Sequence, residues 1–316
     1  MTILNINENP LIDCYNFESF PYNIISLNPS YSDWIASNYI DLCIHKDCEN
    51  ASVPFKSYLF DYTQIPGMKV EKMDRDFFNN VIDSDILKVF KKAIDRGFYI
   101  YLNLDEFYVP NRLAYKNCNY SHDNLIYGYS EENCNFKIFG FTNKRKQQST
   151  EIAFSDLLKG YKNLDQIDNN CFQIYFFKPE ECTYNFSLQV VIDALENYLK
   201  GVDLAKYNSN IKKPELLVYG IDCYKILKEY YLSTKKMDSR ISYKLLEHKK
   251  CIKNTISYLI TNNYLIDEDL LVQVEELIDL GNIIKNLSLK LILIEDTQLI
   301  FKIVQYFEEM EHKEKK

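Results

Sequence analysis

A cysteine near the start of the chain and a histidine more than a hundred residues later could together catalyse acyl transfer. Cys14 follows Asp13, and His122 opens a run of apolar and aromatic residues. A thiol nucleophile needs a lowered pKa, a nearby imidazole and donors for the oxyanion that develops during attack. A helix N-terminus stabilises both the thiolate and the oxyanion, and Asp13 could cap such a helix. We therefore predict that Cys14 is the nucleophile and His122 the base.

The remaining cysteines and histidines favour structural roles. The chain has 9 cysteines at irregular spacing, without a CxxC pair, and 4 histidines. An odd and irregular set of this kind argues against a disulfide framework. His248 lies in the segment Leu245–Lys249 of an expected helix, where a surface or structural role is favoured. Neither an HExxH motif nor a cysteine cluster with zinc spacing occurs, so we expect no metal and no cofactor.

The composition favours a folded cytoplasmic protein. The 316 residues are 47% hydrophobic and 15% aromatic, which is enough for a sizeable core. The net charge of −8 argues against nucleic acid as the main partner, since phosphate binding needs clustered Lys and Arg. We find no secretory signal and no apolar segment long enough to span a membrane, and therefore expect no membrane association.

The first part of the chain mixes strands and helices. Residues 84–97 carry an amphipathic pattern that starts at Ser84 and ends at Gly97, so we predict a helix. The aromatic run at residues 98–104 predicts a central strand, and residues 122–129 and 134–141 predict a β-hairpin. Further strands are expected at residues 58–62, 68–73 and 172–177, with a short helix at residues 155–161.

The remainder of the chain shows helical periodicity alone. Apolar residues recur every three to four positions at 187–199, 241–260, 270–280 and 298–307. The change of pattern falls between Pro179 and Ser187. We therefore predict an α+β catalytic domain at residues 1–180, followed by a helical domain at residues 181–316.

Several segments resemble a known family. Residues 13–16, 102–110 and 122–129 are similar to the BtrH-type N-terminal domain family of butirosin biosynthesis, which is related to papain-like peptidases and to bacteriocin-leader peptidases. Residues 219–224 and 245–249 resemble the C-terminal part of family members found beside thiotemplated peptide assembly lines. The resemblance implies a papain-like cysteine-protease fold, with an antiparallel sheet and a nucleophile helix.

The same resemblance implies amide-bond formation. Members of this kind, including the CtaG-type enzymes of closthioamide assembly, move an acyl group from a carrier-protein thioester to an amine. We therefore expect an acyltransferase of nonribosomal, antibiotic-type biosynthesis, with an acyl- or peptidyl-carrier protein and a small amine as partners. A cysteine peptidase and a non-catalytic binding protein on the same fold remain alternatives. The acidic surface and the helical domain leave both carrier docking and a homodimer open.

The third catalytic residue has two leading candidates. Papain-like enzymes place Asn or Asp just past the strand that follows the histidine strand, and Asn143 holds that position here. Asp105 ends the strand before His122 and could orient the imidazole, bind the amine or hold the chain corner through backbone N–H groups. Asp123 ranks third, because its side chain should point to the opposite face from His122.

The donors for the oxyanion depart from the family pattern. The backbone N–H of Cys14 is the expected first donor, but the place of the upstream amide holds Glu8, which would repel an oxyanion. Asn7 and Asn9 could substitute, or could be turn formers. Pro21 lies seven residues beyond Cys14, so the nucleophile helix must be short or kinked, or must start elsewhere.

Aromatic side chains near the expected site could line an acyl pocket that excludes water. Tyr101, Phe107 and Tyr108 lie close to the predicted strand ends, as does Tyr127. A dry pocket would favour attack by an amine over hydrolysis. Tyr101 and Tyr127 could equally fill the core.

Overall fold

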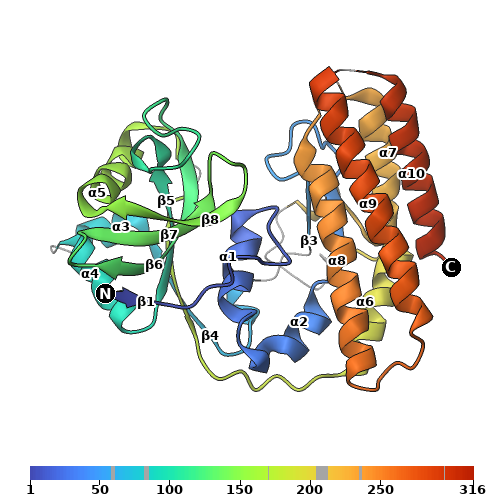
Figure 1. The fold of residues 1–316 in the computed structure, drawn as a ribbon, viewed down its shortest axis with the longest axis horizontal. Coiled ribbons are helices and arrows are strands. Elements are labelled where there is room, and N and C mark those ends of the chain that lie inside the picture. The colour runs from blue at the N-terminus through green and yellow to red at the C-terminus, as the bar shows by residue number, and fades with distance from the viewer. Residues whose placement is uncertain (58–60, 82–84, 170, 204–212, 235–236, 295) are drawn as a thin grey trace. The chain divides into compact units, whose positions relative to one another are not determined.

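The computed structural model describes residues 1–57, 61–81, 85–169, 171–203, 213–234, 237–294 and 296–316 (Figure 1). The chain forms two compact units, one built from residues 1–31 and 62–183, the other from residues 32–61 and 184–316. The expected α+β composition is confirmed. The division differs from a continuous domain at residues 1–180, because residues 32–61 pack with the C-terminal unit.

The first unit is built on a seven-stranded antiparallel sheet. Its order is β4 (Met68–Asp74), β9 (Gln173–Pro179), β5 (Tyr99–Asp105), β6 (Ser121–Ser130), β7 (Asn135–Phe141) and β8 (Gln147–Ala153), with β1 (Thr2–Ile3) beside β6. Gly128 lets β1 approach, since a Cβ there would lie 2.9 Å from the carbonyl oxygen of Thr2. The sequence predicted β4, β5, β9 and the β6–β7 hairpin, and missed β8.

The strand expected at residues 58–62 is not found as such. Residues 58–60 lie outside the described part of the chain, and Tyr62 begins the 3₁₀ turn η2 (Tyr62–Gln64). The neighbouring strand is β3 (Phe55–Ser57), which belongs to the second unit.

Helices pack on both faces of the seven-stranded sheet (Figure 1). On one face α4 (Ile86–Asp95) and α5 (Phe154–Asn163) bury Phe90 and Leu157 against Ile100 and Leu102, while α3 (Arg75–Val81) adds Phe78. On the other face Phe20 of α1 (Asn16–Ile25) packs edge-on against Tyr101. This alternation follows from the period of two along β5.

The predicted helix at residues 84–97 is confirmed with slightly different ends. Asp85 caps α4 by accepting from the Leu87 N–H at 3.0 Å, while Ser84 lies outside the described residues. Gly97 ends the segment in the left-handed region, with φ of 85°.

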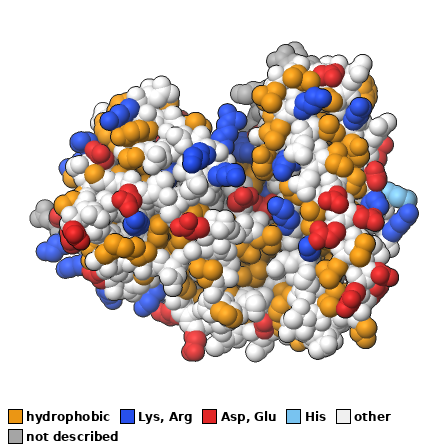
Figure 2. Space-filling model, in the orientation of Figure 1, with side chains coloured by type: hydrophobic (Ala, Val, Ile, Leu, Met, Phe, Trp, Pro, Cys, Tyr) orange, Lys and Arg blue, Asp and Glu red, His pale blue; other side chains and the backbone are white. Residues whose placement is uncertain are grey.

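The second unit is mainly helical. It contains α2 (Ser32–Asn38), α6 (Leu188–Lys200), α7 (Cys223–Ser233), α8 (Ser239–Thr261), α9 (Asp269–Ile294) and α10 (Gln298–Glu314). Helices α7 to α10 enclose one core, which includes Tyr231, Leu245, Ile284 and Phe307. Figure 2 shows acidic, basic and apolar side chains interspersed over the surface of these helices.

The second unit also holds strands that periodicity did not reveal. A three-stranded antiparallel sheet has the order β10 (Leu217–Tyr219), β2 (Leu42–His45) and β3. The expectation of helices alone after Pro179 is therefore wrong at β10, whose three residues are too few to show a period. Thr255 of α8 donates to the carbonyl of Ala36 at 2.9 Å, which helps to tie residues 32–61 into this unit.

Candidate functional site

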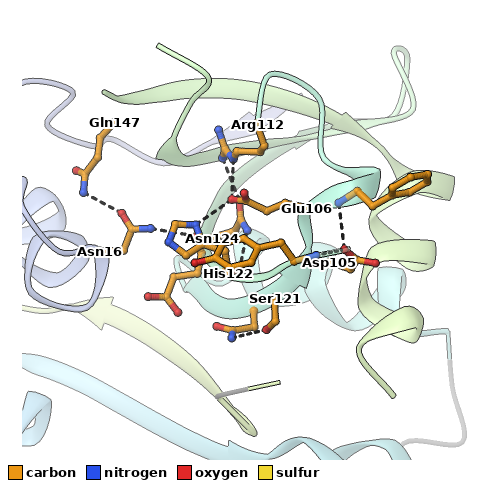
Figure 3. Close-up of polar contacts among 12 residues, drawn as sticks. Asn16, Asp105, Glu106, Arg112, Ser121, His122, Asn124 and Gln147 are labelled. Carbon is orange, nitrogen blue, oxygen red and sulfur yellow. Dashed lines mark hydrogen bonds and ion pairs between the residues drawn. The ribbon is translucent and has the colours of Figure 1, made fainter. Parts of the chain in front are cut away.

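A histidine, a carboxylate and a guanidinium lie together where β5 and β6 meet (Figure 3). The antiparallel register pairs Leu104 with His122, so the residue that follows β5, Glu106, reaches the imidazole. Nδ1 of His122 lies 2.9 Å from Oε1 of Glu106. The His122 side chain is 28% exposed, whereas that of Glu106 is only 6% exposed. The imidazole therefore faces solvent on one side and a buried carboxylate on the other.

Arg112 supports this pair from the interior. Its Nε lies 3.6 Å from Oε1 of Glu106, which is an ion-pair distance longer than a hydrogen bond. Its Nη2 donates to Asn124 at 2.9 Å, and the amide of Asn124 donates to the carbonyl of His122 at 3.0 Å. Gly140 leaves room for the guanidinium, because a Cβ there would lie 3.2 Å from Nη2. We call His122, Glu106, Arg112 and Asn124 the Glu106 network.

The carboxylate of Glu106, helped by the charge of Asp123, raises the pKa of His122. Burial alone disfavours the charged imidazolium, but the hydrogen bond to Glu106 and its negative charge outweigh burial and the opposing charge of Arg112. A carboxylate accepts the Nδ1 proton, so Nε2 is the nitrogen left for proton exchange. A raised pKa favours an imidazolium beside a thiolate over a neutral thiol and imidazole.

The start of α1 is tied to the same strand. Asn16, the first residue of the helix, donates from Nδ2 to the carbonyl of Asp123 at 3.2 Å. Gln147, at the start of β8, donates to Asn16 Oδ1 at 2.9 Å (Figure 3). It also donates to Ser19 Oγ at 2.7 Å. These amide contacts hold the N-terminus of α1 next to the residue that follows His122.

Cys14 is half-buried, forms no disulfide and lies two residues before α1. The N-cap residue is Tyr15, which makes no side-chain cap hydrogen bond, and not Asp13 as expected. Two residues of chain span at most about 7 Å, which keeps Cys14 close to the tethered helix start. The structure thus brings the segment of Cys14 and the strand of His122 to one end of the sheet.

Pro21 is accommodated inside α1. The helix runs through it for 10 residues. Proline has no N–H and would leave the carbonyl of Phe17 without its helical partner. The hydroxyl of Tyr62 donates to that carbonyl at 2.9 Å and replaces the missing bond.

Asp105 holds the corner after β5. It is fully buried, and its carboxylate accepts from the N–H groups of Phe107 at 3.1 Å and Tyr120 at 2.9 Å and from the Asn163 amide at 2.7 Å. These contacts correspond to the third of the roles considered for Asp105. The neighbouring Glu106 is the carboxylate that contacts the imidazole, and it was not among the residues that the sequence singled out.

The other two candidates for the third residue have different surroundings, and the side chain that hydrogen-bonds to the imidazole is that of Glu106. Asn143 is exposed in the turn after β7, where its N–H donates to the carbonyl of Asn111 at 2.8 Å. Burial raises the pKa of Asp123, against the opposing effects of His122 and of a hydrogen bond with Tyr101. Asp123 thus interacts with Tyr101 and, through its charge, with His122 as well.

Asn7 is placed at the wrong end of α1 to stabilise an oxyanion on Cys14. Its amide donates to Ser26, which follows the helix C-terminus, at 3.0 Å. The backbone N–H of Asn9 donates to Asn7 Oδ1 at 3.0 Å, which makes the pair a turn, and Ser149 donates to Glu8. Asn16 and Gln147 are the side-chain amides that lie at the helix start. No local pattern marks Gln147, which is 131 residues from Asn16 in the sequence.

The aromatic candidates divide into core and site residues. Tyr101 is buried and stacks on Tyr175 with ring centroids 5.4 Å apart, so it fills the core, and Tyr127 is also buried. Phe107 and Tyr108 are partly exposed beside Glu106, with their rings 5.1 Å apart. Tyr120, which sequence reasoning missed, places its ring 5.5 Å from the His122 ring and is 53% exposed.

The described residues contain neither a group of metal-ligating side chains nor a membrane-spanning helix. Within the residues the structure describes, no three His, Cys, Asp or Glu side chains are grouped to hold a metal ion. None of the described helices combines the length and the apolar character needed to cross a bilayer. No protein-family model matches this sequence, and no curated protein matches it either.

Proposed function

We propose that the protein is a cysteine-nucleophile acyltransferase in which Cys14 attacks, His122 exchanges the proton and Glu106 orients His122. The observation that carries this proposal is the 2.9 Å contact between His122 Nδ1 and the buried carboxylate of Glu106, beside the start of α1. A base oriented by a third group is one part of the arrangement that nucleophilic catalysis needs, and the hydrogen bond from Asn16 to Asp123 ties the segment that follows Cys14 to the strand of His122. The order of the residues and the helix before the sheet support a papain-like fold.

The proposed reaction has two halves. His122 Nε2 takes the proton of the Cys14 thiol, and the thiolate attacks the carbonyl of a carrier-bound thioester. The carbon–sulfur bond to the carrier breaks, and the carrier thiol leaves with the proton from His122. A primary amine then gives a proton to His122 and attacks the acyl-enzyme, which releases an amide. Cys14 leaves as the thiol after His122 returns the proton.

Stabilisation of the tetrahedral oxyanion is assigned to the helix start. The N–H of Cys14 is the first donor. Asn16 and Gln147 act as positioning residues for this end of α1, since Asn16 connects it to Asp123 of β6 and Gln147 of β8 donates to Asn16 and Ser19. Removing either amide should slow the reaction by loosening the helix start.

An amine rather than water is the proposed acceptor. The resemblance to amide-forming enzymes supports this choice, together with a carrier protein as the donor and a cytoplasmic location. Tyr120 places its ring 5.5 Å from that of His122, and Phe107 and Tyr108 follow Glu106 in the chain; these exposed or partly exposed rings can help to exclude water from an acyl-enzyme. Peptide hydrolysis by the same residues is the second candidate, supported by the same Cys14–His122 arrangement.

Intact-protein mass spectrometry tests the proposal directly. The full chain is mixed with carrier proteins that bear short aliphatic or aromatic acyl thioesters, and then with primary amines. We expect an acyl adduct on the wild type and on Cys118→Ala, a matched control at an exposed cysteine, but none on Cys14→Ala. His122→Ala should slow adduct formation by roughly 10²–10⁴-fold.

Two results would overturn parts of this proposal. Product formation by Cys14→Ala at the wild-type rate would exclude Cys14 as the nucleophile. Cleavage of linear peptides without a carrier protein, with no transfer to amines, would replace the acyltransferase by a peptidase that uses the same residues.

A further inference from the structure

The helical unit contains a cavity of about 540 Å³ between α6, α8, α9 and α10. This volume lies within the range of about 300–1,000 Å³ that is typical of small-molecule sites. Part of its wall is aliphatic, with side chains contributed by three of the helices: Leu195, Leu199, Ile252, Leu270, Val274 and Leu277. Such walls suit an apolar chain.

The carboxylate of Glu314, which lines this cavity, accepts from three donors. Nζ of Lys249 lies 2.5 Å from Oε1 of Glu314, and the hydroxyl of Tyr224 donates to the same oxygen at 2.5 Å. The hydroxyl of Tyr198 donates to Oε2 at 2.6 Å. Lys249 is 1% exposed and Glu314 is 6% exposed. We call Lys249, Tyr198 and Tyr224 the carboxylate cradle.

His248 completes the surroundings of Lys249 without adding charge. Its Nε2 lies 2.6 Å from the carbonyl of Ile40 and must donate to it, so its Nδ1 accepts from Lys249 Nζ at 3.1 Å. Burial and the charge of Lys249 lower the pKa of His248, which keeps the imidazole neutral. The cradle therefore holds a single buried cation, and a buried cation needs an anion.

The anion now in the cradle comes from a helix end. Glu314 is the last residue of α10. Last turns of helices open with little cost in free energy, so this carboxylate can leave more readily than one from a helix interior. Lys313, on the same turn, is held by an ion pair with Glu276 at 2.6 Å at the rim of the cavity.

We propose that the cavity is a binding site for a carboxylic acid with an apolar chain. The ligand carboxylate takes the place of Glu314 on Lys249, Tyr198 and Tyr224, and its chain lies against the aliphatic walls. In the absence of a ligand, the carboxylate of Glu314 from the same chain occupies this position and competes with the ligand. The site lies within the helical unit and does not depend on the proposed acyl transfer.

Calorimetry with octanoate tests the site on the full-length chain. We expect octanoate to bind the wild type, and to bind Glu314→Gln at least tenfold more tightly because the competitor in cis is gone. Lys249→Met should abolish binding. Glu311→Gln removes a carboxylate one turn earlier on α10, paired with Lys228 at 2.9 Å, and should bind like the wild type.

Thermal unfolding gives a second readout that does not depend on Lys249→Met being folded. Glu314→Gln leaves Lys249 buried without an anion, which should lower Tm by roughly 6–10 °C. Octanoate should restore part of this loss, whereas 1-octanol and octylamine should not. Leu270→Trp should weaken octanoate binding by filling the cavity, and Val272→Trp, at a 60% exposed position on the same helix, should not.

Either of two results would overturn the proposal. If octanoate bound neither the wild type nor Glu314→Gln, the cradle would serve only to anchor α10. If 1-octanol bound as tightly as octanoate, the cavity would be an apolar void without carboxylate recognition.

Discussion

Two polar networks in this chain each combine a histidine, a carboxylate and a cationic side chain. They differ in which of these groups contacts the histidine directly. The Glu106 network joins His122 to a carboxylate, with Arg112 behind it. The network around Lys249 joins His248 to an ammonium group, with Glu314 behind it. The pKa of His122 is raised and that of His248 is lowered.

The difference teaches that the direct neighbour decides what a buried histidine can do. A carboxylate on Nδ1 stabilises the imidazolium and leaves Nε2 for proton exchange. A backbone carbonyl on one nitrogen and an ammonium group on the other occupy both nitrogens and keep His248 neutral. The first arrangement suits proton transfer in catalysis. The second lets His248 stabilise the ammonium group of Lys249 by accepting a hydrogen bond from it.

The largest expected effect is a loss of stability when the ion pair between Lys249 and Glu314 is broken. Lys249→Met leaves the carboxylate of Glu314 buried without a cation, which should destabilise the fold by about 3–5 kcal/mol. Lys253→Met is a matched control one turn later on α8, because its partner Glu275 is 48% exposed and such surface pairs contribute less than about 1 kcal/mol. Urea unfolding measures both. Equal losses would mean that Lys249 is not energetically distinct.

Glu106→Gln should have the next largest effect, on the proposed acyl transfer. An amide cannot stabilise the imidazolium as a carboxylate does, so the rate should fall by roughly 10²-fold or more. The pKa of His122, followed by NMR, should fall in the same variant. Glu131→Gln, which removes an exposed carboxylate paired with Lys91, is the control. An unchanged His122 pKa in Glu106→Gln would show that Glu106 does not tune the imidazole.

The same substitution at the two histidines should affect stability differently. His248→Phe leaves the carbonyl of Ile40 without its donor and Lys249 without one acceptor, which should cost about 2 kcal/mol. His122→Phe should change stability by less than about 1 kcal/mol, because its side chain is 28% exposed. Chemical denaturation of the two variants compares them. A larger loss at His122 would contradict the assignment of roles.

Much of the fold could be predicted because its signals are local. The period of α4 and of α8 to α10, and the aromatic runs of β5 and β9, lie within single segments of sequence. The small sheet was missed since its strands are three or four residues long. The packing of residues 32–61 with the C-terminal unit depends on contacts such as Thr255 to Ala36, 219 residues apart, which no window reveals.

The site was less predictable for a related reason. The sequence pointed to the end of β5, but whether Asp105 or Glu106 contacts His122 depends on how the chain turns there. At the turn η3 (Glu106–Tyr108), Asp105 is the N-cap residue and accepts from the N–H of Phe107. Glu106 is then the carboxylate that contacts the imidazole. Gln147 and Asn16 meet only because β8 and α1 are brought together by the fold.

The smallest expected effect is a pH dependence of opposite sign at the two histidines. The raised pKa of His122 means that its contribution to stability is fully present below the unfolded value of about 6.5 and is lost as pH rises through the folded value. The lowered pKa of His248 means that its neutral form contributes above about 6.5, and this contribution shrinks as pH falls.

Unfolding free energies of wild type and variants at pH 5.5 and pH 8 measure this difference. The loss caused by His122→Phe should be larger at the lower pH, since the wild type then gains from the ion pair with Glu106. The loss caused by His248→Phe should be larger at the higher pH, where His248 is neutral in both the folded and the unfolded state and folding requires no loss of a proton. Because burial and Glu106 act against each other at His122, its slope should be the shallower of the two. Slopes of the same sign would show that the direct neighbour does not decide the protonation of these histidines.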